Sequence, residues 1–221
     1  MTHPPLDRLR AYANAEADVT ARLLVEAHLA FCPGCATTVA DYRRMGEPLP
    51  DDTLADQFDV PAFDRVWTAV EHALGPRRAP TVLPPSFLAA LPHPYAWRWL
   101  TIAWPARVRV AVLIRDADTG STLYLCHFAP GGTFPRHCHV GLEENVILAG
   151  AYHTDDVHAE TGDWVTGPPG TEELARADNE GCWCVSRVEP PGVRFTGWRR
   201  WIVPLLARGS STGESRSCSR L

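Results

Sequence analysis

The first 45 residues place apolar side chains at helical spacing. Positions on one helical face recur every three or four residues, as expected for the buried side of an amphipathic helix. Two such runs stand out, formed by Leu6, Leu9, Tyr12 and Ala13, and by Leu23, Leu24, Ala27, His28 and Phe31. The stretch "CPGC" interrupts the pattern, and Val39 and Tyr42 continue it. We therefore expect three short helices within residues 5–45.

Polar residues and prolines indicate where these helices begin. Asp18 or Thr20 is placed to cap the second helix. Pro33 suits the first turn of the third helix, where its missing N–H leaves no hydrogen bond unmade. A fourth helix is expected over residues 61–74, with Asp59 as its cap. Its apolar face would consist of Phe63, Val66, Trp67 and Val70.

Beyond residue 75 the pattern changes twice. The stretch "GPRRAPTVLPPSFLAALPHP" has six prolines in twenty residues, which is typical of a linker. From about Trp97, β-prone runs such as "ARVRVAVLIRD" and "STLYLCHFA" alternate with turn signals such as "DADTG" and "APGGT". Short strands with Gly/Pro turns predict a β-sandwich or barrel. The polar end, "GESRSCSRL", is expected to be disordered.

Charge and composition narrow the function classes. The net charge is −5, every basic residue in the count of 21 is Arg, and no basic run stands out, so nucleic-acid binding has little electrostatic support. The N-terminal stretch lacks the pattern of a signal peptide, and no apolar run approaches the roughly 18 residues of a membrane span. Seven cysteines at metal-like spacings indicate a reducing, cytoplasmic protein.

One candidate metal site lies in "EAHLAFCPGC". His28 and Cys32 are four residues apart and would share a helical face, and Cys35 follows one turn later. Imidazole and thiolate ligands favour Zn²⁺, which takes four ligands in a tetrahedron, and His3 is the candidate for the fourth. The alternative is a surface histidine near two core cysteines, or a redox-active cysteine pair.

A second candidate site lies in "FPRHCHVGLEENVILAG". His137 and His139 would point to the same side of a strand, because the side-chain period is two. Gly141 would allow a bend that brings Glu143 to the same point. Two imidazoles and a carboxylate suit Zn, Mn, Fe or Ni and leave room for water or substrate. The alternative is a solvated histidine pair at a strand end.

The HxxxCxxC pattern on small N-terminal helices resembles the zinc-binding anti-sigma domain. The resemblance covers about residues 1–75, and the layout is most similar to ChrR-like anti-sigma factors, in which a histidine nine residues before an "AYA" is the fourth ligand. His3 stands nine residues before Tyr12 in "AYA". The resemblance implies zinc ligation by His3, His28, Cys32 and Cys35. It also implies that the helices sequester an extracytoplasmic-function sigma factor.

The second half resembles a cupin, with PxHxHxGxE followed by "NVILAG" and GDxxxxPxG. ChrR-like proteins carry such a cupin-like domain after the zinc domain. This chain departs from the family pattern because Glu173 stands where a histidine ligand is expected; Glu173 either completes the site or leaves it weakened. Cys182 and Cys184 suggest either a redox role or two small buried residues, and the buried interpretation is favoured.

These observations predict a two-domain α + β protein: a small zinc-stapled helical bundle followed by an all-β cupin (double-stranded β-helix or jelly-roll) barrel. We expect the helical anti-sigma domain at residues 1–75, a linker at 76–91, the cupin at 92–206 and a disordered tail at 207–221. The expected function is a stress-response regulator, not an enzyme. It would release its sigma factor when the cupin, holding Zn²⁺ or another divalent metal, receives an oxidative or small-molecule signal. The alternative is a metal-dependent, dioxygenase-like cupin enzyme with an N-terminal zinc interaction domain.

Overall fold

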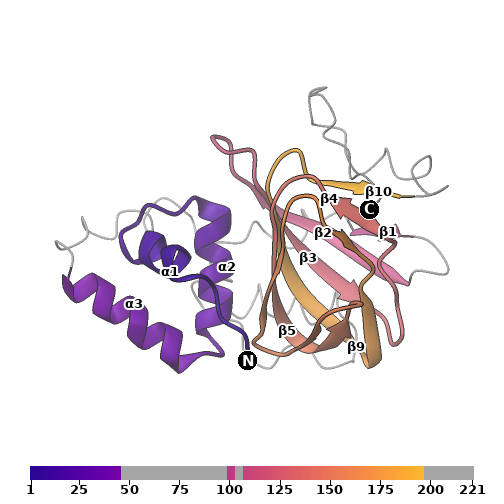
Figure 1. Cartoon of the computed structure of the whole chain (residues 1–221), viewed down its shortest axis with the longest axis horizontal. Helices are drawn as coiled ribbons and strands as arrows, with labels where there is room; N and C mark the ends of the chain where they lie inside the picture. Colours follow the sequence, from indigo (N-terminus) through magenta and orange to yellow (C-terminus); the bar gives the residue numbers. More distant parts are fainter. Residues whose placement is uncertain (46–98, 103–106, 197–221) are drawn as a thin grey trace.

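The computed structural model describes residues 1–45, 99–102 and 107–196, with the backbone alone for 99–102. Three helices come first: α1 (Leu6–Ala13), α2 (Val19–Leu29) and α3 (Pro33–Met45) (Figure 1). The side chain of Asp18 accepts hydrogen bonds from the amides of Thr20 and Ala21, both at 2.9 Å, so Asp18 is the N-cap of α2. Pro33 is the first residue of α3. The three expected helices are therefore confirmed.

Within the described residues, the strands begin at residue 99 and form two antiparallel sheets. The larger sheet has the order β1-β2-β3-β9-β5-β6, with β7 paired to β5, and the smaller has the order β10-β4-β8. The strands are β1 (Trp99–Ile102), β2 (Val108–Arg115), β3 (Thr122–Phe128), β4 (His137–His139), β5 (Glu143–His153), β6 (His158–Glu160), β7 (Trp164–Gly167), β8 (Glu172–Glu173), β9 (Arg176–Val188) and β10 (Val193–Phe195). This barrel after a helical unit confirms the predicted fold class.

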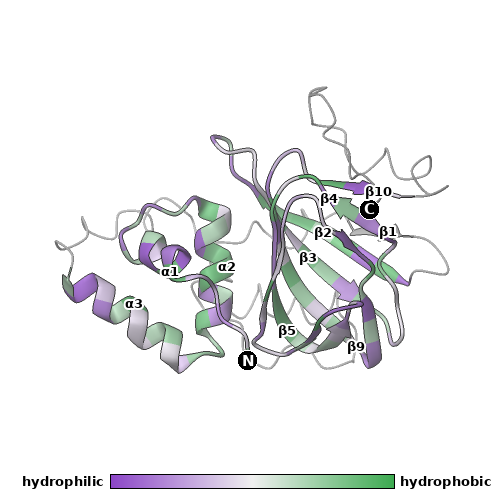
Figure 2. Ribbon diagram, viewed as in Figure 1, coloured by the Kyte–Doolittle hydropathy of each residue, from purple (hydrophilic) through white to green (hydrophobic). Residues whose placement is uncertain are grey.

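Both faces of the large sheet are buried. Its inner face carries one apolar cluster, which includes Ile147, Cys184 and Tyr152. Neighbouring positions on the same strands point the other way, and Val146 and Val185 join a second cluster with the helices. Figure 2 shows apolar residues on both α2 and the strands that face it. The helical unit thus packs on the outer face of the cupin sheet.

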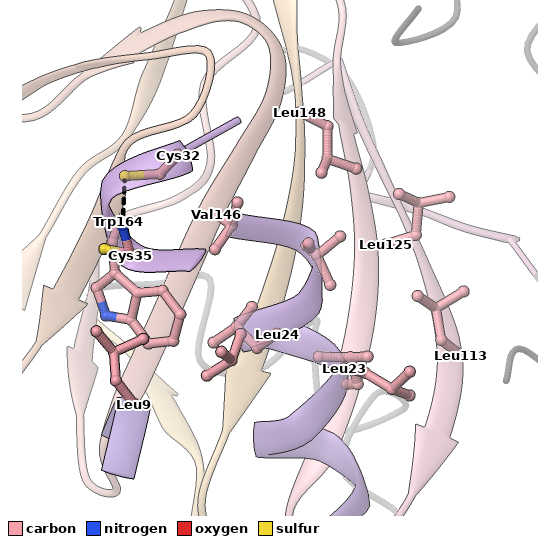
Figure 3. Close-up of a cluster of buried hydrophobic side chains, with 14 of the residues drawn as sticks. Leu9, Leu23, Leu24, Cys32, Cys35, Leu113, Leu125, Val146, Leu148 and Trp164 are labelled. Carbon is pink, nitrogen blue, oxygen red and sulfur yellow. Dashed lines mark hydrogen bonds between the residues drawn. The ribbon is translucent and has the colours of Figure 1, made fainter. Parts of the chain in front are cut away.

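Helix α2 is the element that joins the two units. It lies between the other two helices and the barrel (Figure 1), and almost all of its circumference is buried. Figure 3 shows Leu23 and Leu24 of α2 among side chains of the sheet, including Leu125 and Leu148. A helix that is apolar on most sides is one that is covered on most sides.

A buried ion-pair network accompanies this apolar contact. Arg187 of β9, whose side chain is only 3% exposed, donates to Asp18 and to Thr20 Oγ1 at the start of α2. Arg187 also pairs with Glu144 of β5, and Arg8 of α1 donates to the same carboxylate at 3.0 Å. Each unit therefore supplies charges that the other neutralises, which is the requirement for burying them.

Some expectations fall outside the described residues. These are the helix over 61–74, the linker at 76–91, the tail at 207–221 and the boundaries that these segments set. The domain limits consequently stay predictions. Among the helices of the described part, none combines the length and apolar character needed to cross a membrane.

Two candidate metal centres

The first centre gathers four side chains from three parts of the helical unit. His28 lies on α2, Cys32 precedes α3, Cys35 lies in its first turn, and His3 precedes α1. One ligand atom from each lies within 4.8 Å of the others. The structure thus brings together all four residues of the expected zinc site.

The separations of these atoms correspond to a tetrahedral zinc site. His28 Nε2 lies 3.4 Å from Cys35 Sγ, and His3 Nδ1 lies 3.4 Å from Cys32 Sγ and 3.5 Å from Cys35 Sγ. With Zn–S of about 2.3 Å and Zn–N of about 2.05 Å, a tetrahedron has nitrogen–sulfur edges of about 3.5 Å. The cluster therefore has the size and donor set of a structural zinc site.

Hydrogen bonds prepare these ligands for a cation. His28 Nδ1–H donates to the carbonyl oxygen of Gly162 at 2.9 Å, which leaves Nε2 as the free ligand atom. The Cys35 amide donates to Cys32 Sγ at 3.4 Å, drawn as a dashed line in Figure 3. Burial and the neighbouring Cys32 raise the pKa of Cys35 to about 11. A thiolate here at neutral pH therefore requires a cation such as zinc.

The second centre lies inside the barrel. His137 and His139 are on β4, Glu143 begins β5, and Glu173 of β8 is the cross-strand partner of His137. Glu143 Oε2 lies 3.9 Å from His137 Nε2 and 3.6 Å from His139 Nε2, and Glu173 Oε2 lies 4.0 Å from His139 Nε2. These separations are a few tenths of an ångström longer than the edges of about 3.4 Å in a tetrahedral N/O zinc site.

Both histidines of the second centre present Nε2 to its middle. His137 Nδ1–H donates to the carbonyl of Pro135 at 2.9 Å. His139 Nδ1–H donates to Thr171 Oγ1 at 2.9 Å, and that hydroxyl donates in turn to Pro168 O at 2.7 Å. Both Nε2 atoms are buried without a hydrogen-bond partner in the described part of the chain. Paired orphan nitrogens beside carboxylates fit a divalent metal.

The carboxylates of the second centre repel one another when no cation separates them. Burial raises the pKa of Glu143. Burial and the charge of Glu143 raise the pKa of Glu173 to about 7. Burial lowers the pKa of both His137 and His139, so the imidazoles are neutral and able to ligate. The two neutral imidazoles and Glu143 form the group whose ligand atoms lie within 4.8 Å of one another, and this donor set suits a divalent cation.

The sequence reasoning missed two residues that orient His139. Thr171 holds its ring through the hydrogen bond above, and Gly167 of β7 lies under the ring. A Cβ at Gly167 would stand 2.5 Å from the imidazole Cε1. Both lie in "GPPGT", where the sequence pattern indicated only a cupin-like turn. Nothing local in this turn pattern indicated that it lies against His139.

Gly141 lies in a bend between β4 and β5, as the sequence predicted. The structure adds a second requirement for glycine at this position. A Cβ at Gly141 would lie 2.0 Å from the carbonyl oxygen of Glu189. Gly141 therefore also permits a close backbone approach between the strand connections.

Three cysteines of the barrel, Cys126, Cys182 and Cys184, are core residues. Cys182 and Cys184 of β9 are 1% and 2% exposed, and Cys126 is the cross-strand partner of Cys184. None of the three belongs to either metal-ligand group. Their burial agrees with the interpretation as small buried side chains.

Comparisons with known proteins agree with this architecture. Residues 89–190 match the family model described as the ChrR cupin-like domain. The fold is similar to the crystal structure of Rhodobacter sphaeroides SigE in complex with the anti-sigma ChrR. The TM-score is 0.61, with 22% identity, and the match covers 86% of this chain and 99% of that chain. The similarity thus spans both units.

Other structural similarities involve the barrel. An RmlC-like cupin from Ralstonia eutropha JMP134 has a TM-score of 0.41 and 20% identity, covering 48% of this chain and 70% of that chain. A putative acetylacetone dioxygenase from Methylibium petroleiphilum PM1 has a TM-score of 0.41 and 16% identity, covering 46% of this chain and 75% of that chain. No curated protein sequence matches the chain significantly.

Proposed function

We propose that the chain is a zinc-dependent anti-sigma factor that sequesters an extracytoplasmic-function sigma factor through its helical unit. The observation that carries the proposal is the four-ligand cluster of His3, His28, Cys32 and Cys35 in a helical unit placed before a ChrR-like cupin domain. The fold similarity to the anti-sigma ChrR in its complex with SigE supports the same partner class. In this proposal the zinc ion is structural, since four protein ligands leave no open position.

Zinc has a clear physical role in such a partner-binding unit. The three described helices have 8, 11 and 13 residues, and helices this short are marginal on their own. A metal that joins the segment before α1 to α2 and α3 adds its binding free energy to folding. Loss of zinc would therefore remove the shape that recognises the sigma factor.

The cupin would act as the receiver of a signal. His137, His139, Glu143 and Glu173 would hold Zn²⁺ or another divalent metal, which would offer Lewis acidity and an exchangeable coordination position. An oxidant or a small molecule acting there would change release of the sigma factor only if it favours one of two arrangements of the protein. The tight contact between α2 and the cupin sheet supplies a physical route between the two sites.

A metal-dependent cupin enzyme is the second candidate, in which the helical unit binds another protein. It is favoured by the orphan Nε2 atoms and by Tyr152, whose buried hydroxyl has no hydrogen-bond partner in the described part of the chain. Burial raises the pKa of Tyr152, and the charge of Glu173 adds to the effect, so the phenol is a hydrogen-bond donor near the carboxylates. A redox-active iron and oxygen uptake would support this candidate, whereas firmly held zinc supports the regulator.

The test is transcription by RNA polymerase with the extracytoplasmic-function sigma factor encoded nearest to the gene of this chain. The wild-type chain is expected to co-purify with that sigma factor and to inhibit its transcription. Cys35→Ala should lose both properties. His139→Ala, which alters only the cupin centre, should still inhibit. If the wild-type chain neither binds nor inhibits the sigma factor, the anti-sigma proposal is wrong.

A further inference from the structure

The turn between β6 and β7 of the cupin contacts the segments that carry both histidine ligands of the first metal centre. Its Gly162 carbonyl oxygen accepts the Nδ1–H of His28 at 2.9 Å. The indole of Trp164 meets the His28 ring edge-on, with centroids 6.0 Å apart. His28 is fully buried in this contact. A residue of the helical unit is thus oriented by the backbone of the other domain.

The same turn holds the segment that carries His3. The amide of Thr2 donates to Asp163 Oδ1. Thr2 Oγ1 donates to Trp164 O at 2.7 Å, and the Trp164 amide donates to Thr2 O at 3.2 Å. Thr2 is therefore tied to the first residue of β7 by one backbone and one side-chain hydrogen bond. Because His3 follows Thr2 directly, these bonds set the position from which its ring reaches the cysteines.

The turn is a rigid part of the barrel. The Gly162 amide donates to Ile147 O at 2.8 Å, and the Ile147 amide donates to Asp163 O at 3.1 Å. Asp163 Oδ2 accepts from the Glu160 amide at 2.8 Å. Burial raises the pKa of Asp163, but the amide bonds from Glu160 and Thr2 outweigh it and lower the pKa, so the carboxylate is ionised.

Gly162 shows how closely the two units fit together. Its φ is +91°, a conformation that side chains rarely adopt, and a Cβ there would lie 3.0 Å from Phe31 Cβ. The turn therefore leaves no room for a side chain between itself and the end of α2. A side chain at position 162 would therefore disturb the docking of the two units.

We propose that the β6–β7 turn is the outer shell of the N-terminal zinc centre, with Gly162 and Asp163 as positioning residues for His28 and His3. Zinc affinity of the helical unit then depends on its docking against the cupin, and zinc strengthens that docking by the same factor. Outer-shell partners of metal ligands typically change metal affinity by about 10–100-fold. The inference rests on the proposed zinc site and is independent of the sigma factor.

The test uses Co²⁺, because thiolate-to-cobalt charge-transfer absorption reports only a site that contains cysteine. The full-length metal-free chain is titrated with Co²⁺, and Zn²⁺ then competes for the site. Asp163→Ala is expected to weaken Co²⁺ binding about 10–100-fold. Thr2→Ala is expected to weaken it at least several-fold. Asp155→Ala, an exposed aspartate of the same domain that pairs with Arg136, is the matched control and should bind as wild type.

A variant far from both histidines distinguishes an effect of domain docking from a local effect at the β6–β7 turn. Arg187→Met removes the ion pairs at the start of α2 but contacts neither His3 nor His28. It should weaken Co²⁺ binding if docking sets the affinity. The proposal is overturned if Asp163→Ala, Thr2→Ala and Arg187→Met all bind Co²⁺ as tightly as wild type. Absence of the charge-transfer band in the wild-type chain would instead contradict the zinc site itself.

Discussion

The guanidinium of Arg187 in β9 donates from Nη2 to Asp18 Oδ2 at 2.7 Å, and Asp18 is the N-cap of α2. One carboxylate therefore both begins a helix of the first domain and neutralises a buried cation of the second. The same guanidinium forms ion pairs with Glu144 at 3.1 Å and with Glu189 at 2.7 Å. The docking of the two units is thus specified by a charge network and not by apolar contact alone.

Arg187→Met should destabilise the folded chain. The substitution leaves Glu144, 2% exposed at its side chain, with Arg8 as its remaining cation. Breaking a buried ion pair by removing one partner typically costs about 3–5 kcal/mol. Urea unfolding followed by circular dichroism measures the loss. Arg136→Met removes an exposed pair with Asp155 and should cost about 1 kcal/mol or less. Equal losses in the two variants would contradict the structural role of the network.

The same network predicts a loss of stability in acid. Burial raises the pKa of Asp18, but hydrogen bonds from Thr20 and Ala21 and the charge of Arg187 outweigh it, so the pKa is lowered below 3.8. A depressed folded-state pKa contributes stability above the unfolded pKa of about 3.9 and loses it as pH falls through the folded value. Unfolding free energy should therefore fall more steeply between pH 5 and pH 3 for wild type than for Asp18→Asn.

The control for this acid effect is the exposed Asp118. The variant Asp118→Asn keeps all contacts of Arg187 and should follow the wild-type pH curve. A wild-type curve parallel to that of Asp18→Asn would show that the cap carboxylate has no part in acid unfolding.

The helices and the first metal centre were largely predictable because their information is local. Helical spacing, the cap at Asp18 and the HxxxCxxC pattern all lie within short stretches of sequence. The docking of the domains was not predicted, because the partners of Arg187 come from three distant segments. One local signal was present: the consecutive apolar residues Leu23, Leu24 and Val25 cover more than one face of α2, which indicates a helix covered by more than its two neighbours.

The second metal centre, in the barrel, was likewise predictable only in part. The period of two in "HCH" gave the common direction of His137 and His139. Thr171 and Gly167 contact His139 because two segments far apart in the sequence pack together. This packing could not be predicted from local sequence patterns. Glu173 was placed by resemblance to the cupin pattern, and pairing of β4 with β8 sets it opposite His137. Its ligation of a metal stays a prediction.

Cys35→Ala should release one metal ion per chain and loosen the docked arrangement. Metal analysis of protein purified without added metal is expected to give close to two metal ions for wild type and one for the variant. By reciprocity, amide hydrogen exchange in residues 160–166 should speed up, because His28 and Thr2 no longer hold the β6–β7 turn. Exchange in 122–128, within the barrel, serves as the internal control. Unchanged exchange at the turn would contradict the link between metal and docking.

The raised pKa of Glu173 predicts a pH effect on the stability of the metal-free protein that is opposite in direction to the effect of Asp18. Its pKa of about 7 lies above the usual 4.5, so the folded chain holds this proton more tightly than the unfolded chain. The contribution of Glu173 to stability is then fully present below about pH 4.5 and is lost as pH rises through 7, by roughly 3 kcal/mol at full effect. Glu173→Gln should flatten this part of the curve, and metal loading of the wild type should do the same. A wild-type curve that is flat without metal would refute the crowding of the two carboxylates.

Gly167→Ala tests the support of His139 without substituting any of the candidate ligands. The added methyl would stand 2.5 Å from the imidazole Cε1, so the ring must move and its Nε2 shifts away from Glu143. Metal affinity of the cupin centre should fall about 10–100-fold, as for other changes in the surroundings of a ligand. Competition with a chromogenic chelator, in a Cys35→Ala background that empties the first centre, measures this affinity.

The matched glycine is Gly34, in the first turn of α3, where a Cβ would meet only Cys32 Sγ at an ordinary 3.9 Å. Gly34→Ala should leave the cupin affinity unchanged, because its methyl lies in the other domain. If Gly167→Ala also bound metal as wild type does, the His139 ring would be able to shift without loss of ligation. The "GPPGT" segment would then have no part in orienting the His139 ring for ligation.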